Sequence, residues 1–550
     1  MGMQPKVLVI GWDGATFDLL KPWVEAGELP NLERLMDEGV HGRLRSVPNM
    51  NSGPAWTTVA TGLNPGKHGV YGLVGFTEGS YRLRPLNAAD RHGRTIWRRL
   101  SEAGQRVVVM NLPITHPAEP VNGVLVAGGD APRPSSPRFS YPEDVIEEID
   151  TAAGEYILAA RLDGLIRAGK KQQALDRVYR MIQGRTRAAQ HLMEREDWNL
   201  FFVLFTASDS VQHFFWEDLT GGGPHRDAIL DVYRRLDDAL GTLQAQAGPD
   251  TATILLSDHG FGPIQLGRLY VIDFLAQLGL LRRRAQKDRR AALLRWAFVQ
   301  LEKTLSSRAK EWLLEHFPGL HDRAQAGLWV DQVDWPGTRA FTVHGSSHVW
   351  VNTRDRWPQG IVAPGEEYDA VVAQVQRALE QAVDAETGQP AVAAVHRREE
   401  LYRGPFLERA PDLLIDWTDA PCRAGLAWHG DGERIIASRP VEFRRHPING
   451  SHRPLGIFVA SGTPYRRGAT IEGTALYDIA PTLLHLRDHP IPTSFDGQIL
   501  TEALTTDWLQ THPPRSTEED HDDVAGPGID VPADGEKEVL ERLQALGYTP

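Results

Sequence analysis

The chain has 550 residues, 41% of them hydrophobic, so it is long enough for one large domain with additions or for two domains. Its formal net charge of −13 argues against a protein dedicated to binding the nucleic-acid backbone, which would normally present a basic face. The single cysteine, Cys422, excludes an intramolecular disulfide and a metal cluster held by several thiolates. A metal site would therefore need histidine and carboxylate ligands.

The N-terminal region enters a strand-like run at residues 6–10, without a charged leader, an apolar segment and a cleavage site before it. No apolar stretch reaches the length that crossing a membrane requires. We therefore expect a soluble, cytoplasmic protein without transmembrane anchoring, and the low cysteine content agrees with a reducing compartment. The sequence does not predict the oligomeric state.

From residue 7 to about residue 263, apolar strand-like runs alternate with helical patterns, which is typical of a largely parallel sheet with helices on both faces. The expected strands are residues 7–10, 107–110, 124–127, 201–205 and 254–256. Residues 456–460 are predicted to form another strand, followed by an amphipathic helix around residues 478–484. The sheet domain is therefore expected to close only with this distant segment.

The region from roughly residue 266 to residue 441 is rich in Arg and Gln, and we interpret it as an inserted cap that selects the substrate. The catalytic α/β domain would then consist of residues 1–265 and 442–512. An acidic linker and a C-terminal helix would occupy residues 513–550. A basic helical pattern at residues 291–299 could touch a membrane or a partner, but a helix packed by its apolar face is the simpler interpretation.

Acidic residues follow three of the expected strands, namely Asp13, Asp209 and Asp258. Ligands of an open α/β sheet bind beyond the carboxyl ends of its strands, so these side chains are candidates for one site. His213 lies four residues after Asp209, which places both on one face of a helix, and His259 directly follows Asp258. Carboxylate and imidazole groups of this kind are good metal ligands.

Each of these segments also has a simpler interpretation. Asp13 could cap a helix that begins near Ala15, and the pair at positions 209 and 213 could be a surface ion pair. Positions 258 and 259 could be an acidic cap beside a packed histidine. His452, on a loop before the last expected strand, carries no weight in isolation.

The most distinctive segment is residues 52–69, with the sequence SGPAWTTVATGLNPGKHG. Pro54 suits the first turn of a helix, so Ser52 would lie at a helix N-terminus, where unpaired N–H groups and the helix dipole favour an anion. A phosphate could bind there. The alternative is that Ser52 is an ordinary N-cap, which is the usual role of a serine before a helix.

Together these segments resemble the alkaline phosphatase superfamily and, within it, the type I phosphodiesterase and nucleotide pyrophosphatase branch. The resemblance implies an α/β fold, an alkaline-phosphatase-like sandwich with a largely parallel central sheet flanked by helices, plus an inserted cap domain. The segments that carry it are Gly-Trp-Asp-Gly at residues 11–14, residues 52–69, Asp209 with His213, Asp258-His259-Gly260, His452, and residues 477–482 and 496–497.

The resemblance also assigns roles. One metal would lie between Asp209, His213 and His452, and a second between Asp13, Asp258 and His259 with the Ser52 oxygen. Ser52 would be the nucleophile and form a phosphoseryl intermediate at a site with two divalent metals. The ligand types suit Zn²⁺ and also permit Mn²⁺. The implied activity is hydrolysis of phosphodiester or pyrophosphate bonds in a small-molecule phosphate ester, including nucleotide-type substrates.

One departure from the family pattern leaves the substrate open. Nucleotide pyrophosphatases often carry a phosphate-binding Asn three residues after the nucleophile, and this chain has Ala55 there. Lys67 or a cap residue could replace it, whereas His68 is interpreted as structural. In the cap, Trp350, Asn352, Arg354 and Trp417 could line a substrate pocket, although the cap core is the simpler place for them.

Related activities are alternatives. A phosphomonoesterase of the same fold is the nearest one, because two-metal sites of this kind process either ester class. A sulfatase is less favoured, because Trp56 stands where sulfatases of the superfamily have an Arg. A non-catalytic relative that binds metal or another ligand would be expected to have lost at least one metal ligand.

Overall fold

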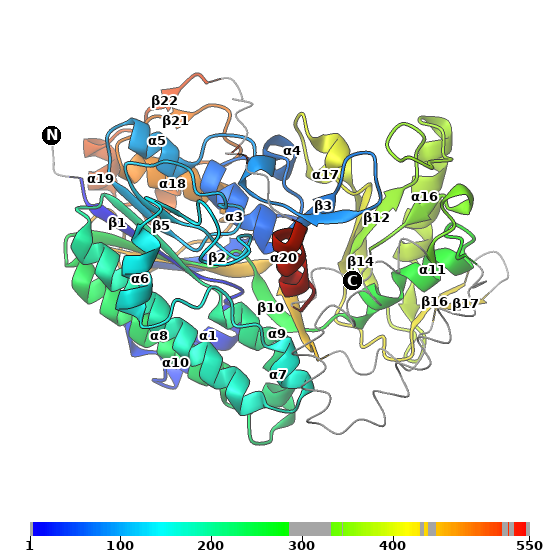
Figure 1. Cartoon of the computed structure of the whole chain (residues 1–550), viewed down its shortest axis with the longest axis horizontal. Coiled ribbons are helices and arrows are strands. Elements are labelled where there is room, and N and C mark those ends of the chain that lie inside the picture. The colour runs from blue at the N-terminus through cyan, green and yellow to red at the C-terminus, as the bar shows by residue number, and fades with distance from the viewer. Residues whose placement is uncertain are drawn as a thin grey trace.

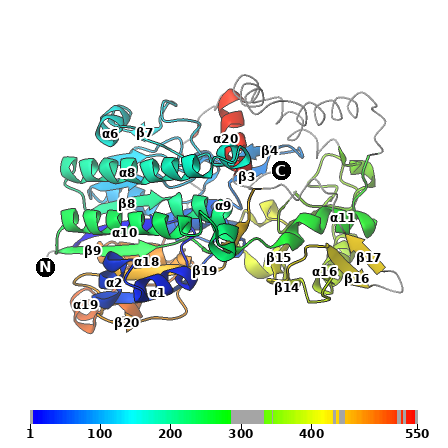
Figure 2. The same ribbon diagram turned by 90° about the horizontal axis from the view of Figure 1, so that it is seen from below.

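The computed structural model describes residues 4–284, 332–343, 345–429, 434–437, 447–519, 526, 528 and 533–545. These residues form a large sheet-and-helix body and a smaller second lobe beside it, as both views show (Figures 1 and 2). The helical pattern expected at residues 291–299 lies outside the described residues.

Within the described residues, the central sheet has nine strands in the order β20-β2-β19-β9-β1-β8-β5-β6-β7. The five consecutive strands β9, β1, β8, β5 and β6 run parallel to one another, so the sheet is largely parallel, as predicted. The strand bounds are β1 Lys6–Trp12, β2 Gly39–Arg45, β5 Val107–Met110, β6 Gly123–Val126, β7 Ser140–Tyr141, β8 Leu200–Phe205, β9 Thr251–Leu256, β19 Leu455–Ser461 and β20 Ala469–Thr470. Each strand expected from the sequence is confirmed.

The distant strand β19 completes the sheet from within, because it lies between β2 and β9 rather than at an edge. It runs antiparallel to both neighbours, with Phe458 opposite Leu256 on one side and Gly42 on the other. The sheet is therefore mixed, and the closure by a distant segment is confirmed.

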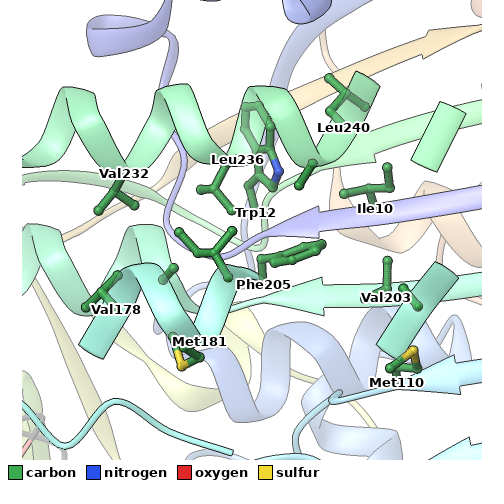
Figure 3. Close-up of a cluster of buried hydrophobic side chains, with 14 of the residues drawn as sticks. Ile10, Trp12, Met110, Val178, Met181, Val203, Phe205, Val232, Leu236 and Leu240 are labelled. Atoms are coloured by element: carbon green, nitrogen blue, oxygen red, sulfur yellow. The ribbon is translucent and has the colours of Figure 1, made fainter. Parts of the chain in front are cut away.

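Helices cover both faces of the sheet, and successive residues of β1 therefore point into two different hydrophobic cores. Ile10 and Trp12 pack with Val178 of α8 (Lys171–Arg195) and Leu236 of α10 (Ala228–Ala247) (Figure 3). Val9 instead belongs to the core formed with α3 (Ser52–Thr61), α5 (Ile96–Glu102) and α18 (Ile479–Leu486).

A helix is present where one was expected around residues 478–484, but its expected amphipathic character is wrong. All eight residues of α18 are buried, because the helix contacts α3, α5 and β21 and has no face toward solvent. A helix enclosed on all sides tolerates apolar residues around its whole circumference.

The second lobe has its own hydrophobic core, built in its described part on the four-stranded sheet β11-β12-β15-β14. Two of the cap positions singled out above, Trp350 and Asn352, are buried, and Asn352 donates hydrogen bonds to three backbone carbonyls. Arg354 is exposed and donates to the carbonyl of Ile361. The lobe elements are β11 Ala340–Phe341, β12 His348–Val351, β13 Val383–Asp384, β14 Val392–Arg397, β15 Leu413–Trp417, β16 Leu426–His429, β17 Arg434–Ala437, α11 Val271–Gln277, α16 Glu366–Glu380 and α17 Arg398–Leu401.

The remaining described elements surround the sheet or connect the two lobes. Their bounds are α1 Phe17–Glu25, α2 Pro30–Asp37, α4 Pro65–His68, α6 Val145–Ala153, α7 Asp163–Arg167, α9 Ala207–Gly221, α19 Thr506–Thr511, α20 Ala533–Ala545, β3 Val74–Phe76, β4 Leu83–Pro85, β10 Gly260–Pro263, β18 Gly450–Arg453, β21 Ile491–Pro492 and β22 Ser516–Thr517. In the described part of the chain, none of the helices has the length and apolar character that crossing a bilayer requires.

The C-terminal helix α20 packs on the body through two apolar side chains and a buried arginine. Val539 and Leu543 join a small hydrophobic cluster with Leu73 and Leu86. Arg542 is buried, and its guanidinium donates hydrogen bonds to the carbonyl oxygens of Gly129 (2.7 Å), Ala131 (2.8 Å) and Pro132 (2.5 Å).

We predict that Arg542→Met will lower the free energy of opening α20 by about 1–3 kcal/mol, because buried carbonyl acceptors are left without a donor. Hydrogen exchange of the α20 amides measures this opening. The control is Lys537→Met on the same helix, which removes only a half-exposed pair with Glu541 and should change the opening energy by about 0.5 kcal/mol or less. Equal effects of the two substitutions would contradict the docking role of Arg542.

Candidate active site

Three neighbouring parallel strands deliver the acidic residues to one edge of the sheet. Strand β1 lies between β8 and β9, and its last residues pair with Phe205 and Leu256 at the ends of those strands. Asp13 directly follows β1, Asp209 lies in the first turn of α9 after β8, and Asp258 follows β9. The expectation that these side chains converge is confirmed.

Asp209, His213 and His452 form the first cluster, called the Asp209 triad below. Asp209 Oδ1 lies 3.2 Å from Nε2 of His213 and 3.3 Å from Nε2 of His452. Helix α9 carries the first two residues at i and i+4, and β18 carries His452. The three ligand atoms lie within 4.8 Å of one another, which is compact enough for one metal ion.

Asp13, Asp258 and His259 form the second cluster, called the Asp13 triad below. His259 Nε2 lies 3.2 Å from Asp258 Oδ2 and 3.6 Å from Asp13 Oδ1, and all three side chains are buried. One oxygen of each carboxylate has a neutral donor: Gly14 N–H on Asp258 Oδ1 and the Trp56 indole N–H on Asp13 Oδ2, both at 3.2 Å. The other oxygen of each carboxylate faces His259 Nε2, and Asp13 Oδ1 also accepts from the Ser52 hydroxyl at 3.4 Å.

Ser52 adjoins the Asp13 triad as the first residue of α3. Its Oγ lies 3.2 Å from His259 Nε2 and 3.4 Å from Asp13 Oδ1. The N-cap of α3 is Asn51, whose side chain accepts from the N–H of Gly53, so the N-cap interpretation of Ser52 is wrong. The capping interpretation of Asp13 is wrong for the same reason, because Thr16 caps the helix that follows it.

Backbone carbonyls orient the three imidazoles in the same way. Each ring directs Nδ1 to a carbonyl oxygen, so Nδ1 carries the proton and Nε2 offers its lone pair to the cluster. The accepting oxygens are those of Gly450 for His213 (3.1 Å), Gly260 for His259 (3.0 Å) and Met50 for His452 (2.7 Å).

This arrangement fits metal ions. Among the residues that the structure describes, Asp209 Oδ1 and Asp258 Oδ2 are buried and have no hydrogen-bond donor. Each faces an imidazole nitrogen that is itself an acceptor, so two lone pairs approach each other at both triads. A divalent cation between such groups satisfies both, and imidazole nitrogen with carboxylate oxygen is a donor set that Zn²⁺ accepts.

The charges in the pocket support the same conclusion. Burial raises the pKa of Asp13 well above its usual range, and the neighbouring Asp258 and Asp209 raise it further. Burial, with the Asp209 charge, raises the pKa of Asp258 to about 7. Burial also acts to raise the pKa of Asp209, but His213 and His452 outweigh it and hold that pKa below the usual range. The Asp13 triad therefore needs a nearby positive charge to be fully ionised at neutral pH.

The two triads touch through aromatic contacts. The rings of His259 and His452 stack with centroids 3.8 Å apart. Phe261 of β10 lies opposite His452 in the antiparallel β10–β18 pair and packs edge-on against His213 and His452, with ring centroids 4.8 and 5.5 Å apart. The two candidate metal positions are thus neighbours, as a binuclear centre requires.

Some contributors to this site were not found from the sequence. Trp56 follows Ser52 by four residues on one helix, and that spacing alone could have placed its side chain beside Ser52. The carbonyl of Met50 has no sequence signal, because any residue supplies a carbonyl. Phe261 is recognised only once β10 and β18 are seen to pair.

Lys67 and His68, both in the segment 52–69, have hydrogen-bond partners within the protein. Lys67 donates to Asp496 Oδ1 at 2.8 Å and to the carbonyl of Ser494 at 2.7 Å, so its ammonium group is bound to the chain itself. His68 is buried between the Thr58 hydroxyl and the Val70 N–H, which agrees with its structural interpretation.

Comparison with known families agrees with the geometry. The sequence profile of the type I phosphodiesterase / nucleotide pyrophosphatase family matches residues 7–439. The chain belongs to this family. It is therefore an enzyme of a hydrolase family within the alkaline phosphatase superfamily, as the resemblance implied. The matched range contains Ser52 and all of the candidate metal ligands except one: Asp13, Asp209, His213, Asp258 and His259 lie within it, and His452 lies beyond it.

Among solved structures, the chain is similar to phosphonoacetate hydrolase from Sinorhizobium meliloti 1021, determined in complex with phosphonoformate. The identity is 15%, the match covers 87% of this chain and 95% of that one, and the TM-score is 0.50. This likeness concerns the fold and supports the alkaline-phosphatase-like α/β architecture. A comparison with curated protein sequences finds no match.

We predict that, in chelator-treated protein, Asp258→Asn will be more stable than the unaltered chain and that the difference will grow from about pH 4 to about pH 7. The folded pKa of Asp258 lies above its unfolded value, so the folded state keeps a proton that the unfolded chain releases in this window, and stability is lost as pH rises. Thermal midpoints at several pH values test this. With metal present the order should reverse, because Asn cannot supply the charged ligand; a pH-independent difference would contradict the interpretation.

Proposed function

We propose that the protein hydrolyses phosphodiester or pyrophosphate bonds of a small-molecule phosphate ester, with Ser52 as nucleophile and two divalent metal ions as cofactors. The observation that carries this proposal is the position of Ser52 Oγ, at the N-terminus of α3 and within 3.4 Å of two members of the Asp13 triad. A group that must lose its proton and attack phosphorus is thus adjacent to a site suited to a cation.

The proposed metal ligands are those of the two triads, and Ser52 Oγ adjoins the second. Bound divalent cations would supply the positive charge that favours an ionised serine and stabilises the entering and leaving oxygens of an in-line displacement. The carbonyls that hold Nδ1 of His213, His259 and His452 keep each Nε2 directed at the cluster, so the ligands need little rearrangement.

The reaction would proceed in two displacements. Ser52 Oγ attacks phosphorus, its proton is lost, and the first ester oxygen leaves as an alcohol or phosphate after taking up a proton. Water then cleaves the phosphoseryl ester, restores the serine hydroxyl and releases the remaining phosphate ester. The N-terminus of α3 lies beside the attacked group, where its N–H groups and dipole favour the phosphoryl oxygens.

Substrate choice would come from the second lobe, for which we propose residues 266–441 as the inserted cap and residues 1–265 with 442–512 as the catalytic domain. The lobe contacts strand β18, which carries His452, directly: Arg453, next to His452, donates to Asp419 at 2.7 Å. Gln265 donates to the carbonyl of Trp417 at 3.2 Å. Because Ala55 stands in place of a phosphate-binding Asn, the proposal does not extend to a specific nucleotide.

We predict that metal-loaded protein will cleave bis(4-nitrophenyl) phosphate and that Ser52→Ala will lower kcat/KM by about 10³-fold or more, because the attacking oxygen is gone. The matched control is Ser210→Ala in α9, whose hydroxyl donates to the carbonyl of Thr206, the residue before the helix, and this variant should leave turnover nearly unchanged. Metal content of both variants is measured to show that the clusters remain filled.

The same assay with 4-nitrophenyl phosphate and 4-nitrophenyl sulfate separates the alternatives. Faster turnover of the monoester would favour a phosphomonoesterase of this fold, and faster turnover of the sulfate a sulfatase. Undiminished diester turnover by Ser52→Ala would overturn the proposed nucleophile.

A further inference from the structure

The contact between Trp56 and Asp13 bears on which metal the Asp13 triad accepts. Trp56 is fully buried in α3, four residues after Ser52, and its indole N–H donates to Asp13 Oδ2 at 3.2 Å. The same carboxylate has Oδ1 beside Ser52 Oγ and His259 Nε2. Its two oxygens are therefore in different surroundings, one on a neutral donor and one at the cluster.

The indole is held in this position by the sheet below it. A Cβ added at Gly11 would lie 2.8 Å from the Trp56 ring, so the glycine leaves the space that the ring occupies. The ring also makes an edge-to-face contact with Phe202 of the neighbouring strand β8, with centroids 6.0 Å apart. A side chain confined in this way keeps its N–H directed at one oxygen.

The second carboxylate of the triad is divided in the same manner, because the Gly14 N–H occupies Asp258 Oδ1. The triad and Ser52 then offer four atoms to a cation: Asp13 Oδ1, Asp258 Oδ2, His259 Nε2 and Ser52 Oγ. Zn²⁺ is commonly four-coordinate with nitrogen and oxygen ligands, whereas Mn²⁺ and Mg²⁺ favour six oxygen-rich positions. A carboxylate that binds through both oxygens would raise the coordination number.

We propose that Trp56 is a metal-selectivity residue: by holding Oδ2 of Asp13 it restricts that carboxylate to one metal-directed oxygen and favours Zn²⁺ over Mn²⁺ at the Asp13 triad. This inference rests on the metal binding proposed above for that triad. Trp56 acts as a positioning residue, because it contacts Asp13 and not the reacting atoms.

The test compares dissociation constants of Zn²⁺ and Mn²⁺, measured by equilibrium dialysis, for the unaltered chain and for Trp56→Phe. Both proteins also carry His213→Ala, which disables the Asp209 triad so that the Asp13 triad is the one filled. Phenylalanine keeps a ring but no N–H, which frees Oδ2 for the ion. We expect the preference for Zn²⁺ over Mn²⁺ to fall by about 10-fold, at the lower end of the changes in metal affinity that follow when a ligand loses its hydrogen-bond partner.

Trp97→Phe is the matched control. Its indole N–H also donates to a buried carboxylate, Glu119 Oε1 at 2.6 Å, but in the cluster with Arg91 and Thr95 rather than at the site. This variant should lose stability comparably and leave the Zn²⁺ to Mn²⁺ ratio unchanged. A general structural defect would lower the stability of both variants and would leave the ratio of their Zn²⁺ and Mn²⁺ dissociation constants unchanged.

The outcomes separate this inference from the proposed function. If the unaltered triad binds neither metal, the proposed function fails together with the inference. If it binds metal and Trp56→Phe has an unchanged ratio, only the role of Trp56 is overturned. Should Trp56→Phe not fold, a crystal structure of the unaltered, Zn²⁺-loaded protein decides: Asp13 bound through Oδ1 alone supports the inference, and Asp13 bound through both oxygens overturns it.

Discussion

The crowding of three carboxylates in one buried pocket is the constraint on which the site depends. Asp13, Asp209 and Asp258 come from the ends of adjacent strands, so the sheet itself forces like charges together. Isolated from water, such a group is stable only if protons or cations compensate it. His213 and His452 stabilise the charge of Asp209, whereas Asp13 and Asp258 keep raised pKa values beside His259, so the pocket is suited to a divalent cation at the Asp13 triad.

Much of this arrangement could be predicted from local sequence patterns. Apolar runs identify the strands, and a residue directly after a parallel strand lies at the ligand-binding edge whatever the rest of the chain does. The i, i+4 spacing of Asp209 and His213 likewise needs only one helix. Long-range packing cannot be predicted in this way, and the full burial of α18 depends on the elements around it. The N-cap of α3 is also one residue away from the expected position, because the side chain of Asn51, and not that of Ser52, accepts a hydrogen bond from the first turn.

The antiparallel pair of strands β10 and β18 links the candidate active site to the second lobe. It follows His259 on one strand, carries His452 on the other, and places Phe261 among the imidazoles. The same strand pair contacts the lobe through the hydrogen bond from Arg453 to Asp419. A displacement of the lobe would therefore be felt at the ligands of both triads, since one small antiparallel element serves as their common support.

The interior position of β19 has a consequence for how the protein is made. Strands β2 and β9 leave the ribosome long before β19, which must later insert between them and form backbone hydrogen bonds with both. Until then each presents an open edge, the kind of surface at which chains associate wrongly. His452 emerges only just ahead of β19, so the three side chains of the Asp209 triad are all present only after the chain has been made through residue 452, and the proposed metal could bind there only from that point on.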